Sequence, residues 1–424
     1  MSSRTYRSTA SVGSGTYRSA GAGEQGHAPA PVRPSAPKRK QPGRTKGTGP
    51  SGRKRRKDPL WAKLLIVFGA LLMMTSGGAI VGSRILLSQV TDSVNQDNLL
   101  GDAAGPGGNN IDGPINLLLL GLDFRDNGQN DLVRADTIII LHIPASHDQA
   151  YLVSIPRDLY VKIPDYPKNK FKGYSTKINA AFAYGHRGEG TEREKRARGV
   201  ELLALTIQQN LAPITFNGAA IIDFAGFEKI LRELGSVTIY VDQEAESIHL
   251  AENAEGKLQR VWYDDTRGKV MDVLPGYAPV KYKPGWQELS PEKALDYSRI
   301  RKGLKFGDYD RQRHQQQLIK AMAKKATSAG MLTSPGKLLR VAEAAGEALT
   351  IDTRGVPLED FFFTLQGVTA NDMVLVKTNA GKTNSLENGS EALTEESKQM
   401  FQAVRDGTLM EWLTTHPHFI ANTG

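Results

Sequence analysis

Residues 115–143 read INLLLLGLDFRDNGQNDLVRADTIIILHI, and this stretch decides the fold. Its two apolar runs, Ile115–Gly121 and Thr137–Ile143, are typical of buried strands. If the two strands form a hairpin, Asp123 after the first and Asp136 before the second lie at one edge of a sheet. Two carboxylates with room for water and phosphate oxygens are a plausible Mg²⁺ site. For either residue alone, an aspartate in a solvated turn is the alternative.

Strand and helix patterns alternate beyond this stretch. Further strands are predicted at Ala150–Ile155 and Val237–Val241. Helices are predicted at Ile178–Gly185, Glu192–Asn210, Phe224–Leu234, Tyr309–Ala326 and Thr394–Leu413. Another helix is expected to begin at Pro291, after the capping residue Ser290. This alternation predicts an α/β fold with helices on the faces of a central sheet. The polar stretch Asp242–Lys283 is too long for an ordinary connection and predicts an excursion at the rim of the site or a mobile loop.

The composition of the N-terminal region predicts a membrane anchor behind a disordered tail. Residues 1–58 are rich in Ser, Gly, Pro, Arg and Lys and have few aliphatic side chains to bury. Leu64–Gly82 is free of charge, and as a helix it would reach roughly 28 Å, enough for one bilayer crossing. We therefore divide the chain into a basic cytoplasmic tail (1–58), a transmembrane helix (59–84), an extracellular connector (85–113) and an extracellular domain (114–424).

The charges around the apolar run predict its orientation. The cluster Arg53–Lys57 precedes it and only Arg84 follows closely, so the N-terminus is expected in the cytoplasm. The basic cluster would then contact anionic membrane lipid. A cleavable signal peptide is the competing interpretation, although the preceding region is long for one.

Charge and cysteine content exclude several classes of protein. Residues 1–58 hold 14 Lys and Arg against 2 Asp and Glu, whereas the rest holds 40 against 43, so the folded part has no excess of positive charge for gripping a nucleic acid. The tail also lacks a helix-turn-helix pattern, which disfavours transcriptional regulation. Since there is no cysteine, disulfides, zinc-thiolate sites and thiol nucleophiles are excluded.

Cationic residues stand where predicted strands end or helices begin, as in the active sites of α/β sheets. They are Arg134, Arg157, Lys177, Arg299, Arg301 and Arg311, with Gln315 four residues after Arg311 on the same helix face. Arg299 and Arg301 share a face only if the chain is extended there. Together these residues suggest a diphosphate held by guanidinium groups, with a metal neutralising the remaining charge. The alternative is that these cations form local salt bridges, for example between Arg311 and a helix-capping Asp308.

The order and spacing of these residues resemble the LytR-CpsA-Psr family of cell-wall ligases. The matching motifs are Gly121–Asp123, Arg134–Thr137, Ser154–Asp158, Lys177–Ala180, Tyr297–Arg301 and Asp308–Arg311. Two positions depart from the family pattern. Val161 stands where some members have arginine, and His314 precedes a pair of glutamines where arginine is common.

The resemblance implies an α/β/α sandwich with a central mixed sheet and an apolar tunnel for a lipid tail. It implies Mg²⁺ on Asp123 and Asp136, and a polyprenyl diphosphate headgroup on Arg134, Arg157, Lys177, Arg299, Arg301, Arg311 and Gln315. Asp308 would orient the cluster and act in catalysis with Arg157, Arg299 and Arg301. Residues with the character of a tunnel wall, or alternatively of ordinary core, are Leu202, Leu203, Leu205, Ile207, Phe224, Phe227, Ile230 and Leu231.

The implied reaction moves a glycopolymer from a polyprenyl diphosphate carrier to a hydroxyl of peptidoglycan. Asp308 and Asp310 are both candidates for accepting the hydroxyl proton. A pyrophosphatase that uses water as the acceptor, and a non-catalytic lipid or wall binder that regulates envelope assembly, remain alternatives. The identity of the glycopolymer stays open at this point.

Overall fold

The computed structural model describes residues 95–105, 110–123, 133–328, 335–365 and 367–421. A seven-stranded sheet has the order β1-β15-β7-β2-β3-β4-β16 and is mixed, because three of its six pairings are parallel and three antiparallel. Its strands are β1 (Asn95–Gln96), β2 (Ile115–Asp123), β3 (Arg134–Ile143), β4 (Ala150–Ser154), β7 (Gly218–Asp223), β15 (Leu349–Asp352) and β16 (Met373–Val376). The predicted α/β class and the hairpin of residues 115–143 are confirmed.

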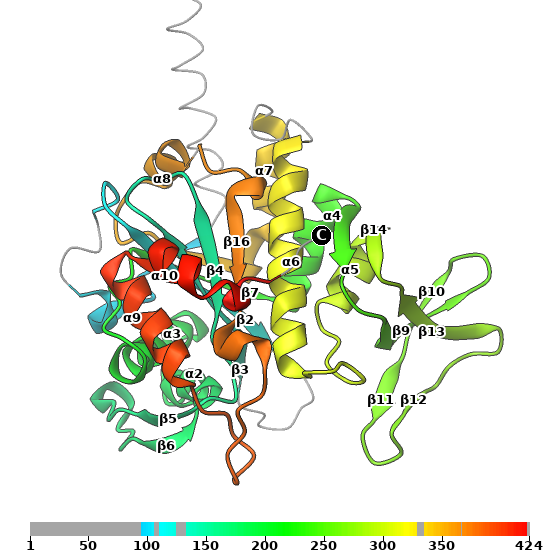
Figure 1. The fold of residues 1–424 in the computed structure, drawn as a ribbon, viewed down its shortest axis with the longest axis horizontal. Helices are drawn as coiled ribbons and strands as arrows, with labels where there is room; N and C mark the ends of the chain where they lie inside the picture. The colour runs from blue at the N-terminus through cyan, green and yellow to red at the C-terminus, as the bar shows by residue number, and fades with distance from the viewer. Residues whose placement is uncertain (1–94, 106–109, 124–132, 329–334, 366, 422–424) are drawn as a thin grey trace, which may run out of the picture. The chain divides into compact units, whose positions relative to one another are not determined.

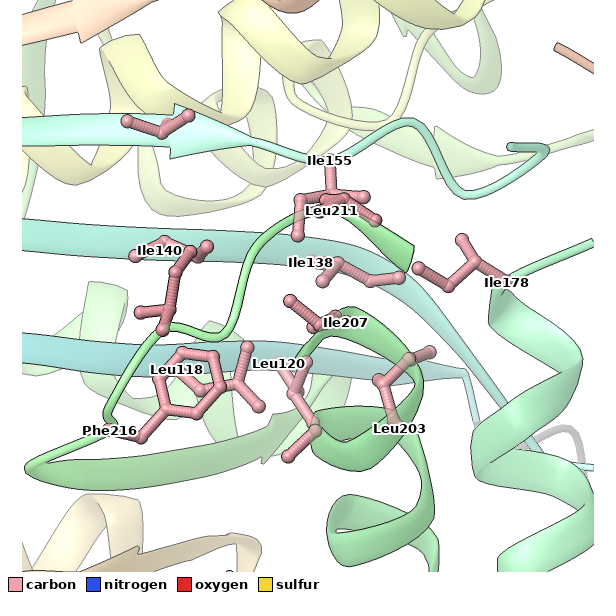
Figure 2. Close-up of a cluster of buried hydrophobic side chains, with 14 of the residues drawn as sticks. Leu118, Leu120, Ile138, Ile140, Ile155, Ile178, Leu203, Ile207, Leu211 and Phe216 are labelled. Atoms are coloured by element: carbon pink, nitrogen blue, oxygen red, sulfur yellow. The ribbon is translucent and has the colours of Figure 1, made fainter. Parts of the chain in front are cut away.

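One face of the sheet is covered by α2 (Asn179–His186), α3 (Glu192–Asn210), α9 (Glu395–Asp406) and α10 (Leu409–Thr415). Alternate residues of the central strands, such as Leu118, Leu120 and Ile138, meet Leu203 and Ile207 of α3 there (Figure 2). Burial of large aliphatic side chains stabilises this interface by about 1.5–3 kcal/mol for each side chain. The core therefore fixes the sheet on which the candidate site stands.

The other face carries α6 (Asp308–Ser328), α4 (Phe224–Leu234) and α8 (Leu358–Leu365) (Figure 1). The intervening residues of these strands, including Leu119 and Ile139, point to this side, where Ile319 of α6 packs. Helices α5 (Pro291–Tyr297) and α7 (Pro335–Ala345) lie beside α4. Helices thus lie on both faces, as in the expected α/β/α sandwich.

The stretch predicted as an excursion or mobile loop is a β-structure. Strands β9 (Ala245–Asn253), β10 (Leu258–Arg260) and β13 (Tyr277–Tyr282) form a three-stranded sheet, and β11 (Trp262–Asp264) and β12 (Lys269–Met271) form a hairpin. We call residues 245–282 the arm; it projects to the right in Figure 1. Of the two alternatives, an excursion agrees with this arm, whereas a mobile loop is wrong, because the polar residues of this stretch occupy the exposed faces of short strands, where alternation is interrupted at each turn.

The remaining elements are short. A hairpin pairs β5 (Tyr160–Ile163) with β6 (Tyr174–Lys177), and β8 (Val237–Val241) pairs with β14 (Gly285–Leu289). The 3-10 turns are Gly101–Ala104, Pro167–Asn169, Gly346–Ala348, Ala370–Asp372, Thr378–Gly381 and Pro417–Phe419. The single terminal helix predicted at Thr394–Leu413 is wrong, since Gly407 adopts φ 70° and ends α9 before α10 begins.

The predicted membrane anchor lies outside the described residues, as do the basic tail and residues 85–94 and 106–109 of the connector. Within the part of the chain that the structure describes, no helix is both long and apolar enough to cross a bilayer. The divisions at residues 58, 84 and 113 stay predictions.

Candidate functional site

A β-bulge at the start of β3 places Asp136 at the centre of the site. Leu122 faces Ala135 and Gly121 faces Thr137 across the hairpin, so Asp136 is the additional residue on its strand. Such a bulge turns a side chain away from the regular alternation of the strand. The backbone of Asp123 ends β2 opposite Arg134, which confirms that both acidic residues lie at one end of the hairpin. The side chain of Asp123 lies outside the described part of the structure.

Arg157, which follows β4, points at this bulge. Its Nη1 lies 2.8 Å from Oδ1 of Asp136, and its Nε lies 3.5 Å from Oδ1 of Asp308 and 3.7 Å from Oδ2 of Asp158. Burial alone would lower the pKa of Arg157, but the carboxylates of Asp136, Asp308 and Asp158 raise it. Arg157 therefore stays charged at the centre of three acidic groups.

The first turn of α6 closes the cluster from the other side. Nη2 and Nε of Arg311 lie 2.7 and 3.0 Å from Oδ1 of Asp308, and Nη2 also donates to the backbone oxygen of Asp136 at 3.0 Å. Gln312 donates to Oδ2 of Asp308 at 3.1 Å. Arg311 is only 4% exposed. The structure therefore contains the local ion pair with Asp308 that the sequence offered as the alternative to a diphosphate contact.

Asp308 is held as an anion in this setting. Burial would raise its pKa, but the charges of Arg311 and Arg157 and the hydrogen bonds from Gln312 and Arg311 lower the pKa below its ordinary value. A carboxylate whose oxygens already accept these bonds is a weak proton acceptor. The geometry of Asp308 is that of a residue that positions Arg157 and Arg311.

Asp310 is also held by buried hydrogen bonds and an ion pair. It is 1% exposed, accepts a hydrogen bond from the backbone N–H of Phe306 at 2.8 Å and pairs with Nη1 of Arg313 at 2.7 Å. Arg313 also pairs with Asp242 at 2.6 Å. This network joins α6 to the end of β8, and sequence reasoning missed it because Asp242 lies far away in the chain.

The other predicted cations lie around this centre. Lys177 pairs with Asp158 at 2.9 Å, and Arg134 is exposed at the hairpin end. Arg299 lies in the turn after α5, with its guanidinium carbon 4.8 Å above the ring of Phe224. The chain there is a turn, not extended, because the N–H of Arg299 bonds to the oxygen of Asp296 at 2.9 Å. The assumption that Arg299 and Arg301 share one face of an extended segment is therefore wrong.

Arg301 is exposed and lies on the side of the arm. Its neighbour Lys302 pairs with Asp265 at 2.5 Å. The hydrogen bond and charge of Lys302, and more weakly the charge of Arg301, lower the pKa of Asp265. No contact joins Arg301 to Asp136 or Asp308 among the described residues, so the structure does not bring it into the central cluster.

An apolar cavity of about 210 Å³ lies beneath the cluster, between the sheet and α4 and α6. Thr137, which follows Asp136, and Gly121, two residues before Asp123, line it, as do Phe224, Phe227 and Ile230 of α4. The other candidates for a tunnel wall belong to the core. Leu202, Leu203, Leu205 and Ile207 pack on the opposite face of the sheet. Leu231 of α4 is buried in the apolar core that α4 shares with β8 and α5. Helical periodicity alone does not distinguish these two faces.

Gln315 links the cavity to the polar cluster. It stands one turn after Arg311 on α6 and lines the cavity, 8% exposed. Its Oε1 is buried without a hydrogen-bond partner among the described residues. Because a carboxamide can present either its oxygen or its NH₂ group, this unpaired group in an apolar wall suits the polar part of a ligand.

Asp223 was not predicted as a site residue. It ends β7 beside Leu122 of β2, caps α4 by accepting from the N–H of Gly226 at 2.8 Å, and lines the apolar cavity. The available signal was an apolar run that stops at an aspartate just before a helix.

The described residues contain no group of three or more His, Cys, Asp and Glu side chains that could hold a metal ion. Mg²⁺ commonly uses one or two carboxylates and completes its shell with water and substrate phosphates. Oδ1 of Asp136 pairs with Arg157, whereas Oδ2 accepts no bond from the described residues. The donor set at the hairpin end therefore fits a Mg²⁺ ion that arrives with a phosphate ligand.

Comparison with known proteins adds a family assignment. A protein-family model described as the LytR_cpsA_psr family matches residues 87–406. The chain is 26% identical over 344 residues to the cell wall biosynthesis protein LcpA of Corynebacterium glutamicum, covering 74% of this chain and 59% of that protein. It is 27% identical over 226 residues to the polyisoprenyl-teichoic acid–peptidoglycan teichoic acid transferase TagU of Enterococcus faecalis, covering 53% and 58%.

A third relative is the regulatory protein MsrR of Staphylococcus aureus, 30% identical over 213 residues, which cover 50% of this chain and 49% of MsrR. The chain thus matches less than two thirds of the length of these relatives. Among solved structures, a protein of Streptococcus agalactiae gives a TM-score of 0.49 at 20% identity over 70% of this chain and 88% of the other. TagV of Bacillus subtilis gives 0.46 at 23% identity over 72% and 98%.

Proposed function

Because this chain belongs to the LytR-CpsA-Psr family, we propose that it is a phosphotransferase that moves a glycopolymer from a polyprenyl diphosphate carrier to a hydroxyl of peptidoglycan. Relatives named for cell wall biosynthesis and for teichoic acid transfer to peptidoglycan support this class of reaction. One structural observation carries the proposal: the cluster of arginines and aspartates adjoins an apolar cavity, whose lining includes Thr137 next to Asp136 and Gln315 one turn after Arg311. A ligand that fits both parts has an anionic head and a lipid tail.

The size of the cavity bears on how the tail would bind. At about 210 Å³ it is smaller than the roughly 300–1,000 Å³ of typical ligand pockets. It would therefore hold the part of the polyprenyl chain next to the diphosphate, while the rest extends to the membrane. Phe224 connects the two regions, since it lines the cavity and supports Arg299 on its ring.

In the proposed reaction, a hydroxyl oxygen of peptidoglycan attacks the sugar-side phosphorus, and the bond from that phosphorus to the bridging oxygen breaks. Polyprenyl phosphate leaves, the glycan becomes attached through a phosphodiester, and one proton is released. Arg157 and Arg299 stabilise the charge that builds on the phosphate oxygens, and Asp308 keeps Arg157 and Arg311 in place. Neither Asp308 nor Asp310 is supported as the proton acceptor, because both carboxylates are held by cations.

Mg²⁺ is part of this proposal. Asp136, with Asp123 from the neighbouring strand end, would hold the ion. Bound there it would neutralise charge on the diphosphate. Arg157 would turn from Asp136 toward a phosphate oxygen as the carboxylate receives the metal.

The location of the reaction is proposed from the sequence. The basic cluster Arg53–Lys57 before the apolar run Leu64–Gly82 supports a single membrane crossing with the catalytic domain outside the cell. The lipid-linked donor and the wall would then be on the same side as the domain.

The experiment combines the full-length protein in detergent with a polyprenyl diphosphate-linked oligosaccharide and washed peptidoglycan. We expect Mg²⁺-dependent formation of polyprenyl phosphate and glycan bound covalently to the wall, and loss of both products with EDTA. Arg157→Ala should reduce both, whereas Arg267→Ala, an exposed arginine on the arm, should reduce neither. Polyprenyl phosphate formed without wall-bound glycan would identify a pyrophosphatase instead, and no turnover by wild type would leave a lipid or wall binder.

A further inference from the structure

A second cavity, of about 450 Å³, lies beside the candidate site, between the arm and helices α4 and α5. We call it the arm cleft. Arg299, a predicted headgroup ligand, lines it, and Asp223, Phe224 and Leu295 line both the arm cleft and the apolar cavity. A molecule in the arm cleft would therefore reach the place where the head of the lipid is expected.

The outer wall of the arm cleft is held by buried polar contacts. Asp296 of α5 is 3% exposed and accepts hydrogen bonds from Ser247 at 2.8 Å and Tyr282 at 2.6 Å. Its Oδ1 also lies 3.2 Å from Nδ1 of His249, which faces the cleft. Since both Ser247 and Tyr282 belong to the arm, these contacts fix the arm against α5 and keep the cleft open in one geometry.

Three further contacts connect the arm with the site. Arg260 of β10 lies 3.1 Å from Oε2 of Glu228 on α4, across the cleft. Lys302, in the loop that follows Arg301, pairs with Asp265 and lies 5.7 Å from the centre of the Tyr263 ring. The arm is thus attached to the same loop that carries Arg299 and Arg301.

The charges in the arm cleft indicate the class of its ligand. Its lining has four carboxylates, on Asp223, Glu228, Glu292 and Asp296, against the two guanidinium groups of Arg260 and Arg299. An excess of carboxylates repels a phosphodiester polymer. Carboxylate acceptors and guanidinium donors in the same cleft suit the hydroxyl and amide groups of an uncharged saccharide chain.

We propose that the arm cleft binds the glycan chain of the acceptor, so that a sugar hydroxyl is presented to the diphosphate beside Arg299. This inference rests on the proposed transferase function and gives that site its second substrate. It also supplies the feature by which a transferase differs from a pyrophosphatase, a groove for an acceptor other than water. The donor polymer, when it is anionic, would leave the site by another path.

The test uses full-length protein and a soluble, uncrosslinked peptidoglycan fragment of two disaccharide units. Arg260→Ala removes a donor from the cleft, and Ala225→Trp fills it from an exposed position of α4. Both variants should bind the fragment at least tenfold more weakly by calorimetry and lose wall transfer by a similar factor, while their affinity for polyprenyl diphosphate stays that of wild type. The dissociation constants separate the acceptor from the donor.

Matched controls come from the same elements. Arg267→Ala removes an arginine of the arm outside the cleft. Lys229→Trp enlarges a side chain of α4 that does not line the arm cleft but lines a neighbouring groove of about 640 Å³, between α4, β1 and the start of α3. Both should bind the fragment as wild type does. Ala225 also lines that groove. If Lys229→Trp weakened binding of the fragment as much as Ala225→Trp does, the glycan would bind in the groove and the proposal would be wrong.

The two proposals fail in different ways. If wild type transfers glycan to the wall and neither Arg260→Ala nor Ala225→Trp changes fragment affinity, the arm cleft is not the acceptor site. If wild type forms no polyprenyl phosphate with any acceptor, the transferase function itself is wrong.

Discussion

Nη1 of Arg157 lies 2.8 Å from Oδ1 of Asp136. The carboxylate proposed to bind Mg²⁺ therefore forms an ion pair with the guanidinium group proposed to bind phosphate. Both are about 15% exposed, which limits competition from water. A Mg²⁺ diphosphate ligand can replace this pair with two stronger ones, metal to carboxylate and phosphate to guanidinium. The ion pair therefore keeps the site ordered before the ligand binds.

The first prediction concerns Asp136→Ala. Because Arg157 keeps Asp308 and Asp158 as neighbours, the free energy of unfolding should fall by less than the roughly 3–5 kcal/mol that removing one partner of a buried ion pair costs. Wild type should melt at higher temperature with Mg²⁺ and a polyprenyl diphosphate analogue together, and the variant should lose most of this gain. A variant with the full ligand-dependent gain and normal turnover would show that Asp136 is only a scaffold for Arg157.

The second prediction is the effect of pH on Asp308→Asn. Its folded-state pKa is lowered, so its contribution to stability is present above the ordinary carboxyl value near 4 and disappears as pH falls through the lower folded-state pKa. At pH 7 the variant should be less stable by about 3 kcal/mol, because Arg311 and Arg157 lose their shared anion. Denaturant unfolding from pH 7 to pH 2.5 should show this difference shrinking at the acid end. A difference independent of pH would mean that the charge of Asp308 does not stabilise the cluster.

The hairpin and its acidic end could be predicted from sequence because every signal there is local. The apolar runs, the flanking Asp123 and Asp136, and the helices Glu192–Asn210 and Phe224–Leu234 follow from periodicity within one segment. The register of the hairpin was not predictable, since the bulge at Asp136 depends on how two strands pair. That register decides where the carboxylate points.

The arm and the charge pairing needed three-dimensional information. Asp242 and Arg313 are 71 positions apart but lie 2.6 Å from each other, and no local pattern connects them. The strands of the arm were missed because short strands with exposed polar faces resemble loops in composition. Cations that looked equivalent in sequence also differ in role, since Arg311 is buried against Asp308 while Arg134 and Arg301 are exposed.

A third prediction concerns acid sensitivity at His142 on β3. It is 1% exposed, its Nδ1 lies 2.7 Å from Oδ1 of Asn116, and burial lowers its pKa to about 4. The unfolded chain binds this proton near pH 6.5, so stability is complete above that pH and falls between 6.5 and 4, by about 3 kcal/mol in all. His314 is also buried with a lowered pKa and adds in the same direction.

The measurement compares wild type with His142→Gln by denaturant unfolding at pH 7, 5.5 and 4.5. The stability of the variant should decrease less over this range than that of wild type. NMR titration of the His142 ring should give a midpoint well below 6. A midpoint near 6.5 would contradict the burial argument.

A fourth prediction concerns topology. The flank Arg53–Lys57 and the apolar Leu64–Gly82 predict that protease added to intact cells stripped of wall digests the domain after residue 113 and leaves residues 1–58 protected. A tag at each end, read by immunoblot, reports both halves in one sample. Digestion of the N-terminal tag with protection of the C-terminal one would reverse the orientation.

The last prediction tests whether the apolar cavity holds a lipid tail. Ala220 of β7 pairs with Leu119 of β2 in the parallel register and lines the cavity, so a larger side chain there occupies space intended for the ligand. Ala220→Val should weaken binding of polyprenyl diphosphate modestly and Ala220→Phe by tenfold or more, while both bind inorganic diphosphate as wild type does. Filling an empty apolar cavity also improves packing, so neither variant should melt much below wild type without ligand. Equal affinity of all three proteins for the lipid would place the tail elsewhere, and weaker binding of inorganic diphosphate would mean that the substitution disturbs the arginine cluster itself.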